Sequence, residues 1–591
     1  MKTLKLERLT PAPPEGDLLD SPAFPKAAVR ELGNETQAKN LHHATHTIRA
    51  KRQAVVSELD NWQDIRQAGA DIKNRVGRHL DHYLAEFEKN ATAAGAHVHW
   101  ARDAEEANRI VIDLVRATGE SEVTKVKSMV SQEIDLNEHL EEARIAAWET
   151  DLAELIVQLG HDRPSHILVP AIHRNRSEVR EIFLREMGQY GTPCPPDVTD
   201  EPAELAAAAR VHLREKFMRT KVGISGANFA IAETGSLVVV ESEGNGRMNL
   251  TLPETLISVV GIEKILPTFQ DLEVFLQLLP RSSTGERMAP YGTIWTGARE
   301  GDGPRDVHII LLDNGRTKVL SDPIGRAALR CIRCSACLNI CPVYEKVGGH
   351  AYGSVYPGPI GAILNPQIRG LESVVDRSLP FASTLCGACN EVCPVKIPIS
   401  NILVHLRRKA VDKKRAEAGL RPHVEPILMA GGGWVMGKGW RLGAAARMAS
   451  VGGRVMGLFM HHIGNWHIPG VHRWTRARDV PMLPKRSARA TFARRKKREA
   501  RQLKRMQKEV QKKLQGQLGC DPSVIDGAAN SPTTPQQLPQ LPHGAAQLPP
   551  AAGQSAPGQN TPANAPQLSQ LPPNPTCAPD IFGRPTTEEL S

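Results

Sequence analysis

Along the first 315 residues, the apolar positions follow two patterns, one typical of helices and one typical of strands. Between residues 36 and 90, apolar side chains recur every three to four positions, as at Val55, Leu59 and Trp62. That spacing places them on one face of a helix, so the pattern predicts helices over most of this stretch. The apolar runs that follow are short and continuous, which favours buried strands.

Short apolar runs predict strands at AHVHW (96–100), EVTKV (122–126), HILVPAI (166–172) and SLVVVESEGNGRMNLTLP (236–253), the last as two strands. Asn245-Gly246 lies inside the last run and suits a hairpin turn. Asp103 is expected to cap a helix that runs to Ala117. Helices that alternate with strands predict a mixed α/β domain over residues 35–315.

The pattern changes after residue 315. Segment 316–424 lacks β-rich runs, and 44 residues separate Cys341 from Cys386, which leaves room for helices. We therefore expect an all-α domain there. Composition assigns the other regions: a Pro-rich N-terminal extension (1–34), a Gly- and Trp-rich region (425–484), a basic helix (485–515) and a disordered Pro-rich tail (516–591).

The net charge of +10 comes from one segment of the chain. Between Lys485 and Lys513, fourteen Lys and Arg residues stand against two Glu, a local balance of +12 that leaves −2 elsewhere. A nearly neutral body argues against specific nucleic-acid binding. The basic helix is most often a solvated face, and the alternatives are a peripheral contact with anionic lipid near membrane quinones or a contact with RNA.

The cysteines point to metal chemistry in a reducing compartment. The N-terminal residues MKTLKLERLTPAPPEGD contain no apolar core of a signal peptide, and no apolar window long enough for a bilayer is present, so a cytoplasmic location is expected. There, ten cysteines favour metal ligands over disulfides. Seven of the ten fall in two similar stretches, CIRCSACLNICP (331–342) and STLCGACNEVCP (383–394).

Both stretches follow the C-x2-C-x2-C-x3-C-P spacing of bacterial ferredoxins, except that Ser383 stands at the first position of the second. In that arrangement three thiolates bind one [4Fe–4S] cube and the fourth cysteine serves the other cube. The spacing therefore predicts two [4Fe–4S] clusters. The ligands expected for cluster one are Cys331, Cys334, Cys337 and Cys393, and those for cluster two are Cys341, Cys386 and Cys389, with Ser383 as a candidate fourth ligand.

Ser383 leaves one corner of cluster two open. Besides a serine alkoxide, the iron there could take another residue, a water or a partner's group, or the cluster could hold three irons. Ser383 could also cap its loop without touching metal. Structural zinc is the main alternative to clusters, but zinc ligands normally come in separated pairs rather than in a repeated triplet.

CIRCSACLNICPVYEKVGGHAYGSVYPGPIGAIL (331–364) and STLCGACNEVCPVKIPI (383–399) closely resemble the LutB/LldF family of lactate-utilisation iron–sulfur proteins. KVKSMVSQEI (125–134) and GISGANFAIAETGSLVVVESEGNGRM (223–248) look like the LUD domain of that family. GGGWVMGKGWRL (431–442) is similar to its C-terminal region. Seven cysteines and a serine also fit the family pattern.

The resemblance implies a LUD domain with a NagB/RpiA/CoA-transferase-like α/β fold, followed by an α-helical ferredoxin domain. It also implies an oxidoreductase subunit that carries electrons while L-lactate is oxidised to pyruvate. The implied partners are a CCG-domain cysteine-rich protein (LutA-like) and a smaller LUD protein (LutC-like). The alternatives are a carrier for another 2-hydroxy acid such as glycolate, a heterodisulfide-reductase-like carrier, or a redox-sensing ligand-binding protein.

No catalytic residue follows from spacing alone. Lys127, Ser128 and Glu133 come after a predicted strand, where α/β folds commonly place ligands. Thr234, in the run Glu233 to Ser236, and Arg247 are further candidates to bind a small anion, although such residues are more often solvated or part of turns. Neither a G-x-G-x-x-G fingerprint nor a P-loop is present. Four histidines are expected to be structural: His161, His166, His173 and His350.

Overall fold

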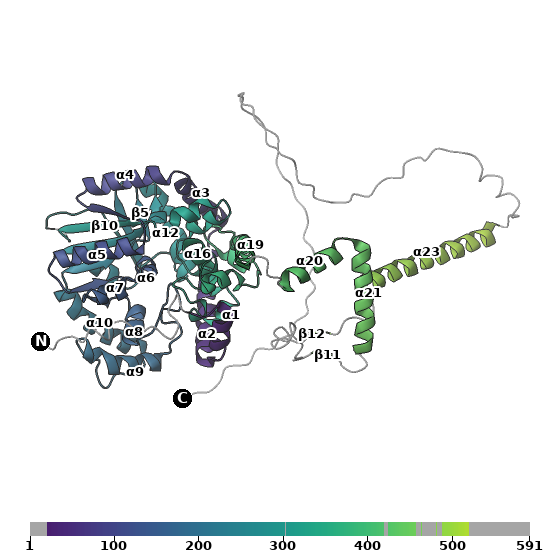
Figure 1. Ribbon diagram of the computed structural model, residues 1–591, viewed down its shortest axis with the longest axis horizontal. Coiled ribbons are helices and arrows are strands. Elements are labelled where there is room, and N and C mark those ends of the chain that lie inside the picture. The colour runs from purple at the N-terminus through teal and green to yellow at the C-terminus, as the bar shows by residue number, and fades with distance from the viewer. Residues whose placement is uncertain are drawn as a thin grey trace, which may run out of the picture. The chain divides into compact units, whose positions relative to one another are not determined.

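The computed structural model describes residues 21–301, 303–418, 424–456, 462–463, 480–481 and 487–518. The chain divides into two compact units, Met1–Pro422 and His423–Ser591. The α/β part and the cysteine-bearing part both belong to the first unit (Figure 1).

A six-stranded parallel sheet forms the centre of the α/β part. Every neighbouring pair of strands in it is parallel. Apart from the edge strand β1, the strands are almost wholly buried, as expected for a sheet covered on both faces. The strands, in sheet order, are β1 (His97–Ala101), β10 (Asp306–Leu312), β7 (Thr255–Gly261), β4 (Val222–Ser225), β2 (Glu122–Lys125) and β3 (Ala146–Glu149).

A second, four-stranded sheet lies in the same part of the chain. In sheet order its strands are β8 (Ile265–Leu266), β5 (Phe229–Ile231), β6 (Ser236–Glu241) and β9 (Tyr291–Trp295). The helices that alternate with the strands are α5 (Ala104–Ala117), α6 (Met129–Glu133), α7 (Leu136–Glu142), α8 (Leu152–Leu159), α9 (Arg176–Glu186), α10 (Pro202–Arg219), α11 (Asn245–Thr251) and α12 (Phe269–Ser283), with 3-10 turns η2 (Met187–Gln189) and η3 (Ile262–Lys264).

Two sequence predictions are confirmed at the start of this part. The Asp103 side chain accepts the backbone N–H of Glu106 and caps α5, which ends at Ala117. The helical stretch between residues 36 and 90 is also confirmed. It consists of α2 (Glu35–Val56), α3 (Trp62–Arg78) and α4 (Leu80–Ala93), preceded by α1 (Phe24–Glu31) within the expected N-terminal extension.

The cysteine-bearing part is helical, and residues 313–418 contain no strand. Its α16 is almost wholly buried, and α2 of the N-terminal region contacts α14 and α15, so the two parts share one hydrophobic core. The elements are α13 (Arg316–Ser321), η4 (Gly325–Arg330), α14 (Ala336–Asn339), α15 (Tyr344–Val347), η5 (His350–Tyr352), α16 (Gly358–Ile368), α17 (Val374–Ser378), η6 (Leu379–Phe381), α18 (Ala388–Val392) and α19 (Ile399–Ala418).

The predicted hairpin over residues 236–253 is wrong. Its first half is β6, but the second half is helix α11. Gly244 adopts a left-handed conformation with φ of 82° that ends the extended run. The carboxylate of Glu241 then accepts the N–H groups of Gly246 and Arg247, so the first turn of a helix forms where a strand was expected.

The strand predicted at residues 166–172 is also wrong, because this segment forms bends and turns. Nδ1 of the buried His166 accepts the backbone N–H groups of both Leu168 and Val169, at 3.1 and 3.0 Å. A side chain therefore takes the place of a neighbouring strand as hydrogen-bond partner, and the chain turns.

The second unit contains α20 (Val424–Met436), α21 (Gly439–Met456), the short strands β11 (His462–Ile463) and β12 (Val480–Pro481), and α23 (Ala488–Leu518). Helix α23 confirms the basic helix expected at 485–515. The tail predicted to be disordered lies, beyond residue 518, outside the described residues, as do residues 1–20. Among the helices described, none is both long and apolar enough to span a bilayer.

Candidate iron–sulfur centre

The two cysteine stretches form loops with the same backbone turns. Arg333 and Leu385, at equivalent positions, have φ of 61° and 56°. Two residues further on, Ser335 and Gly387 have φ of 63° and 85°, and each loop then enters a short helix, α14 or α18. Left-handed conformations are uncommon for non-glycine residues. The shared turns bring closely spaced cysteines around one point in each loop.

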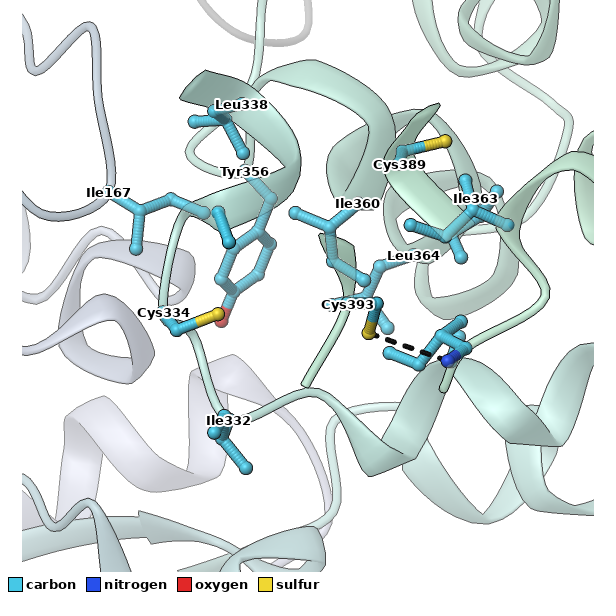
Figure 2. Packing of buried hydrophobic residues seen from close by; sticks show 14 of the residues in the cluster. Ile167, Ile332, Cys334, Leu338, Tyr356, Ile360, Ile363, Leu364, Cys389 and Cys393 are labelled. Carbon is cyan, nitrogen blue, oxygen red and sulfur yellow. Dashed lines mark hydrogen bonds between the residues drawn. The ribbon is translucent and has the colours of Figure 1, made fainter. Parts of the chain in front are cut away.

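Four of the seven cysteines line one cavity. Cys331, Cys334 and Cys337 come from the first loop, and Cys393 comes from the end of the second. Cys334 and Cys393 lie in the same buried cluster (Figure 2). The N–H of Ile397 donates to the Cys393 sulfur at 3.4 Å. The structure therefore brings together the four residues expected to hold cluster one.

The other three cysteines form a second group. Burial, together with the neighbouring thiolates of Cys341 and Cys386, raises the pKa of Cys389 to about 11. Burial likewise raises the pKa of Cys341, and Cys386 adds to this shift. Cys341 comes from the first loop and the other two from the second. Each loop thus places its last cysteine with the cysteines of the other loop.

Iron–sulfur clusters fit this donor set better than zinc does. Four thiolates on one zinc ion, at about 2.3 Å from the metal, would lie roughly 3.8 Å from one another. Within the described residues, the groups of three or more candidate ligands whose atoms lie within 4.8 Å of one another contain only histidines and carboxylates. The wider spread of the sulfurs suits a cube, whose thiolates bind at separate corners.

Backbone N–H groups also point at the sulfurs. The N–H of Arg333 lies 3.4 Å from the Cys331 sulfur, and that of Tyr344 lies 3.5 Å from the Cys341 sulfur. Such contacts stabilise thiolate charge and tune the reduction potential of a bound cluster. The chain therefore places N–H donors beside thiols that are candidate cluster ligands.

A buried network of charges holds the first loop against the α/β part. Arg333 Nη2 donates to Glu263 Oε1 at 3.2 Å, and Arg316 binds the other oxygen of the same carboxylate. Arg316 also donates to Glu133 at 2.8 Å, and the Tyr356 hydroxyl donates to Glu133 at 2.6 Å. Although burial opposes it, the two arginines hold the pKa of Glu263 down to about 2.

The second loop has different surroundings. Cys386 is exposed, and Leu385 and Phe381 are 36% and 49% exposed. Ser383 Oγ accepts the N–H of Leu385 at 3.1 Å, just as the Cys331 sulfur accepts the N–H of Arg333. The serine oxygen therefore makes the same hydrogen bond within its loop as the Cys331 sulfur makes in the first loop.

Most candidates from the α/β sequence have structural roles. Glu133 belongs to the charge network described above. The Thr234 hydroxyl lies 2.7 Å from that of Ser236, which in turn bonds to Thr296. Arg247 is exposed over the ring of Tyr291. Ser128 caps α6 by accepting the N–H of Ser131, and Lys127 donates to the carbonyl oxygen of Leu168. Both residues also line a cavity beside the carboxyl ends of β2 and β4.

The histidines bond within the fold, as expected. His166 Nε2 lies 3.2 Å from the side-chain oxygen of Asn339 in α14. His350 Nε2 lies 2.8 Å from the carbonyl oxygen of Arg163. His173 contacts Asp162 and Ser165, and His161 lies 3.6 Å from Glu186.

Sequence reasoning missed two cations beside the first loop, Lys264 and Arg333. Arg333 could have been noticed, because it lies between two ligand cysteines. Lys264 gave no signal, because its position depends on η3 following the central strand β7. Burial and the charge of Arg333 together lower the pKa of Lys264 to about 8.

Comparison with known proteins agrees with this architecture. Residues 84–312 match the LUD domain family, and residues 327–397 match the 4Fe-4S dicluster domain family. The chain is therefore an iron–sulfur protein in which a LUD domain precedes a dicluster domain.

Relatives that match most of the chain identify the family within this class. "Lactate utilization protein B" of Oceanobacillus iheyensis is 44% identical over 403 residues, which cover 68% of this chain and 81% of that protein. The protein of the same name from Bacillus subtilis is 39% identical over 481 residues, covering 80% and 96%. The chain belongs to the lactate utilization protein B family, which confirms the resemblance seen in its motifs.

Proposed function

We propose that this protein is the iron–sulfur electron-transfer subunit of a complex that oxidises L-lactate to pyruvate. The observation that carries the proposal is the exchange of cysteines between the loops: Cys393 lines the cavity of the first-loop cysteines, while Cys341 lies with Cys386 and Cys389. This is the arrangement of a two-cluster ferredoxin, whose clusters each pass single electrons. The names of the relatives supply the link to lactate.

Two [4Fe–4S] clusters follow from this assignment. Cluster one takes Cys331, Cys334, Cys337 and Cys393, and cluster two takes Cys341, Cys386 and Cys389. For the fourth corner of cluster two, the position of the Ser383 oxygen supports serine as the ligand, because it accepts the same loop N–H that a sulfur accepts in the first loop.

The unequal surroundings of the loops suggest a direction for the electrons. The first loop is buried against the LUD domain, through contacts such as that of Tyr344 Oη with the carbonyl oxygen of Ser165, at 2.8 Å. The second loop is exposed at Cys386. Electrons would therefore enter on the LUD side and leave through the second loop to a partner. The proposed partners are a CCG-domain cysteine-rich protein and a smaller LUD protein.

Anaerobic purification of the full chain together with both partners tests the proposal. With L-lactate as the reductant, we expect the clusters to be reduced, as a decrease in absorbance near 400 nm and as new EPR signals. Glycolate in place of lactate tests the closest alternative, since a glycolate carrier would respond to it preferentially. A redox sensor would carry clusters but give no turnover with lactate and a dye acceptor, and this result would refute the proposal.

A further inference from the structure

Arg333 has hydrogen-bonding groups that the fold leaves unused. Its side chain is only 7% exposed and lies over the ring of Tyr356, 4.6 Å from the ring centre. Nη2 donates to Glu263, and the guanidinium also lies against the sulfur of Cys331. The buried Nε and Nη1 find no further acceptor within the described residues. A buried guanidinium with unused donors is costly, and such groups usually have a partner that is not part of the chain.

Arg333 also lines the cavity at the strand ends. This cavity has a volume of about 300 Å³ and is bordered by Lys127 and Ser128 after β2, by Gly226 after β4, and by Lys264. Its size is at the lower end for small-molecule sites, which span roughly 300–1,000 Å³. The carboxyl ends of parallel strands are also where α/β folds bind their ligands.

Two lysines add positive charge to this cavity. Lys264 is 5% exposed and makes no hydrogen bond or ion pair within the described part of the chain. Lys127 Nζ donates to the carbonyl oxygen of Leu168 at 2.5 Å and can still offer its other hydrogens. With Arg333, these side chains present a cluster of donors that suits a carboxylate.

The same cavity contains three acceptors. Asp151, Glu241 and Glu243 line it, and their carboxylates accept the backbone N–H groups at the starts of α8 and α11. Their remaining lone pairs can accept a hydrogen bond from a ligand hydroxyl. A ligand that carries a carboxylate and a hydroxyl group on adjacent carbons would use both kinds of residue.

We propose that this cavity binds the 2-hydroxycarboxylate substrate, with its carboxylate on Arg333 and Lys264. The inference rests on the proposed function and adds to it the place of substrate binding. It puts the ligand beside the first loop, because Arg333 lies between Cys331 and Cys334. Lys264 binds the carboxylate of the substrate, and the acidic residues accept a hydrogen bond from its hydroxyl group.

Calorimetric titration of the full, cluster-loaded chain with L-lactate tests this inference. The native chain should bind L-lactate, and Lys264→Gln should weaken the affinity at least tenfold. Lys127→Gln, a second cavity variant, should weaken it as well and keeps the test valid if the first variant folds poorly. Lys221→Gln, at a lysine that is 56% exposed, is the matched control and should bind like the native chain.

Propionate, which lacks the hydroxyl group, should bind the native chain several-fold more weakly than L-lactate. Equal affinity for the two acids would contradict the role of the acidic residues. Unchanged lactate affinity in both lysine variants would refute the proposed binding site. This holds even if Lys264→Gln shifted the reduction potential of the cluster, because the cations would then serve only to offset cluster charge.

Iron content and partner-driven reduction, measured on the same preparations, separate the two proposals. Chains that contain iron and accept electrons, but whose lysine variants bind lactate normally, would refute the substrate site and leave the proposed function intact. Iron-poor native chains would refute the proposed function and the inference that rests on it.

Discussion

The two cysteine loops share two left-handed backbone turns but have very different surroundings. The first is buried and joined to the LUD domain by Arg333, Glu263 and Arg316, whereas the second exposes Cys386 and Leu385 to solvent. Burial and nearby charges set the potential of an iron–sulfur cluster. Two clusters with nearly the same ligands can therefore differ in potential, and the difference comes from what each loop contacts.

Replacing the exchanged cysteine should have the largest effect. Cys393→Ser should remove cluster one and roughly half of the iron, because the fourth thiolate of that site comes from the second loop. Iron quantitation and EPR check this, with Cys194→Ser as a control, since Cys194 is buried in a separate core. If the spectrum of Cys393→Ser matched that of Cys389→Ser, the exchanged arrangement would be wrong.

Disrupting the charge network that holds the first loop should have the next largest effect. Arg316 is 1% exposed, and its removal leaves the carboxylates of Glu133 and Glu263 buried without their main partner. Arg316→Gln should lower the free energy of unfolding by about 3–5 kcal/mol in urea denaturation. Arg305→Gln, at an arginine that is 76% exposed, should cost about 1 kcal/mol or less. Equal effects of the two changes would mean that the network does not anchor the loop.

His166 makes the anchoring of the first loop sensitive to acid. Burial and the charge of Lys127 lower its pKa to about 3, and its Nδ1 already accepts two N–H groups. Since the pKa is about 6.5 in the unfolded chain, stability is fully present above that pH and falls as the pH decreases.

When the pH falls from 7.5 to 5.5, His166 should lower the free energy of unfolding by about 1.4 kcal/mol. His166→Gln keeps an acceptor and a donor but does not titrate. The free energy of unfolding of this variant should therefore fall less than that of the native chain over the same pH range, by the same amount. Parallel pH profiles for the two proteins would contradict this account of His166.

The smallest expected effect is that of Ser383→Ala. If Ser383 binds iron, the EPR spectrum of cluster two should change while that of cluster one stays the same. Thr384→Ala removes a neighbouring exposed hydroxyl group and should leave both spectra unchanged. An unchanged spectrum in Ser383→Ala would exclude alkoxide ligation and show that the serine only shapes its loop.

Local patterns predicted what local chemistry determines. The cysteine spacing predicted the two sets of cysteines that the fold brings together. Asp103 marked the start of α5, because an N-cap acts within one turn. The sequence misled where a side chain replaced a backbone partner. Glu241 converts an expected strand into α11, and His166 bends an apolar run. Lys264 joins Arg333 only through the tertiary fold, which no local pattern contains.

Iron and acid-labile sulfide in the anaerobically purified full chain test the central claim most directly. The account predicts about eight irons and eight sulfides per chain, with absorbance near 400 nm, if cluster two holds four irons like cluster one. A colourless protein with little iron, or with stoichiometric zinc instead, would contradict the claim that these seven cysteines hold two iron–sulfur clusters.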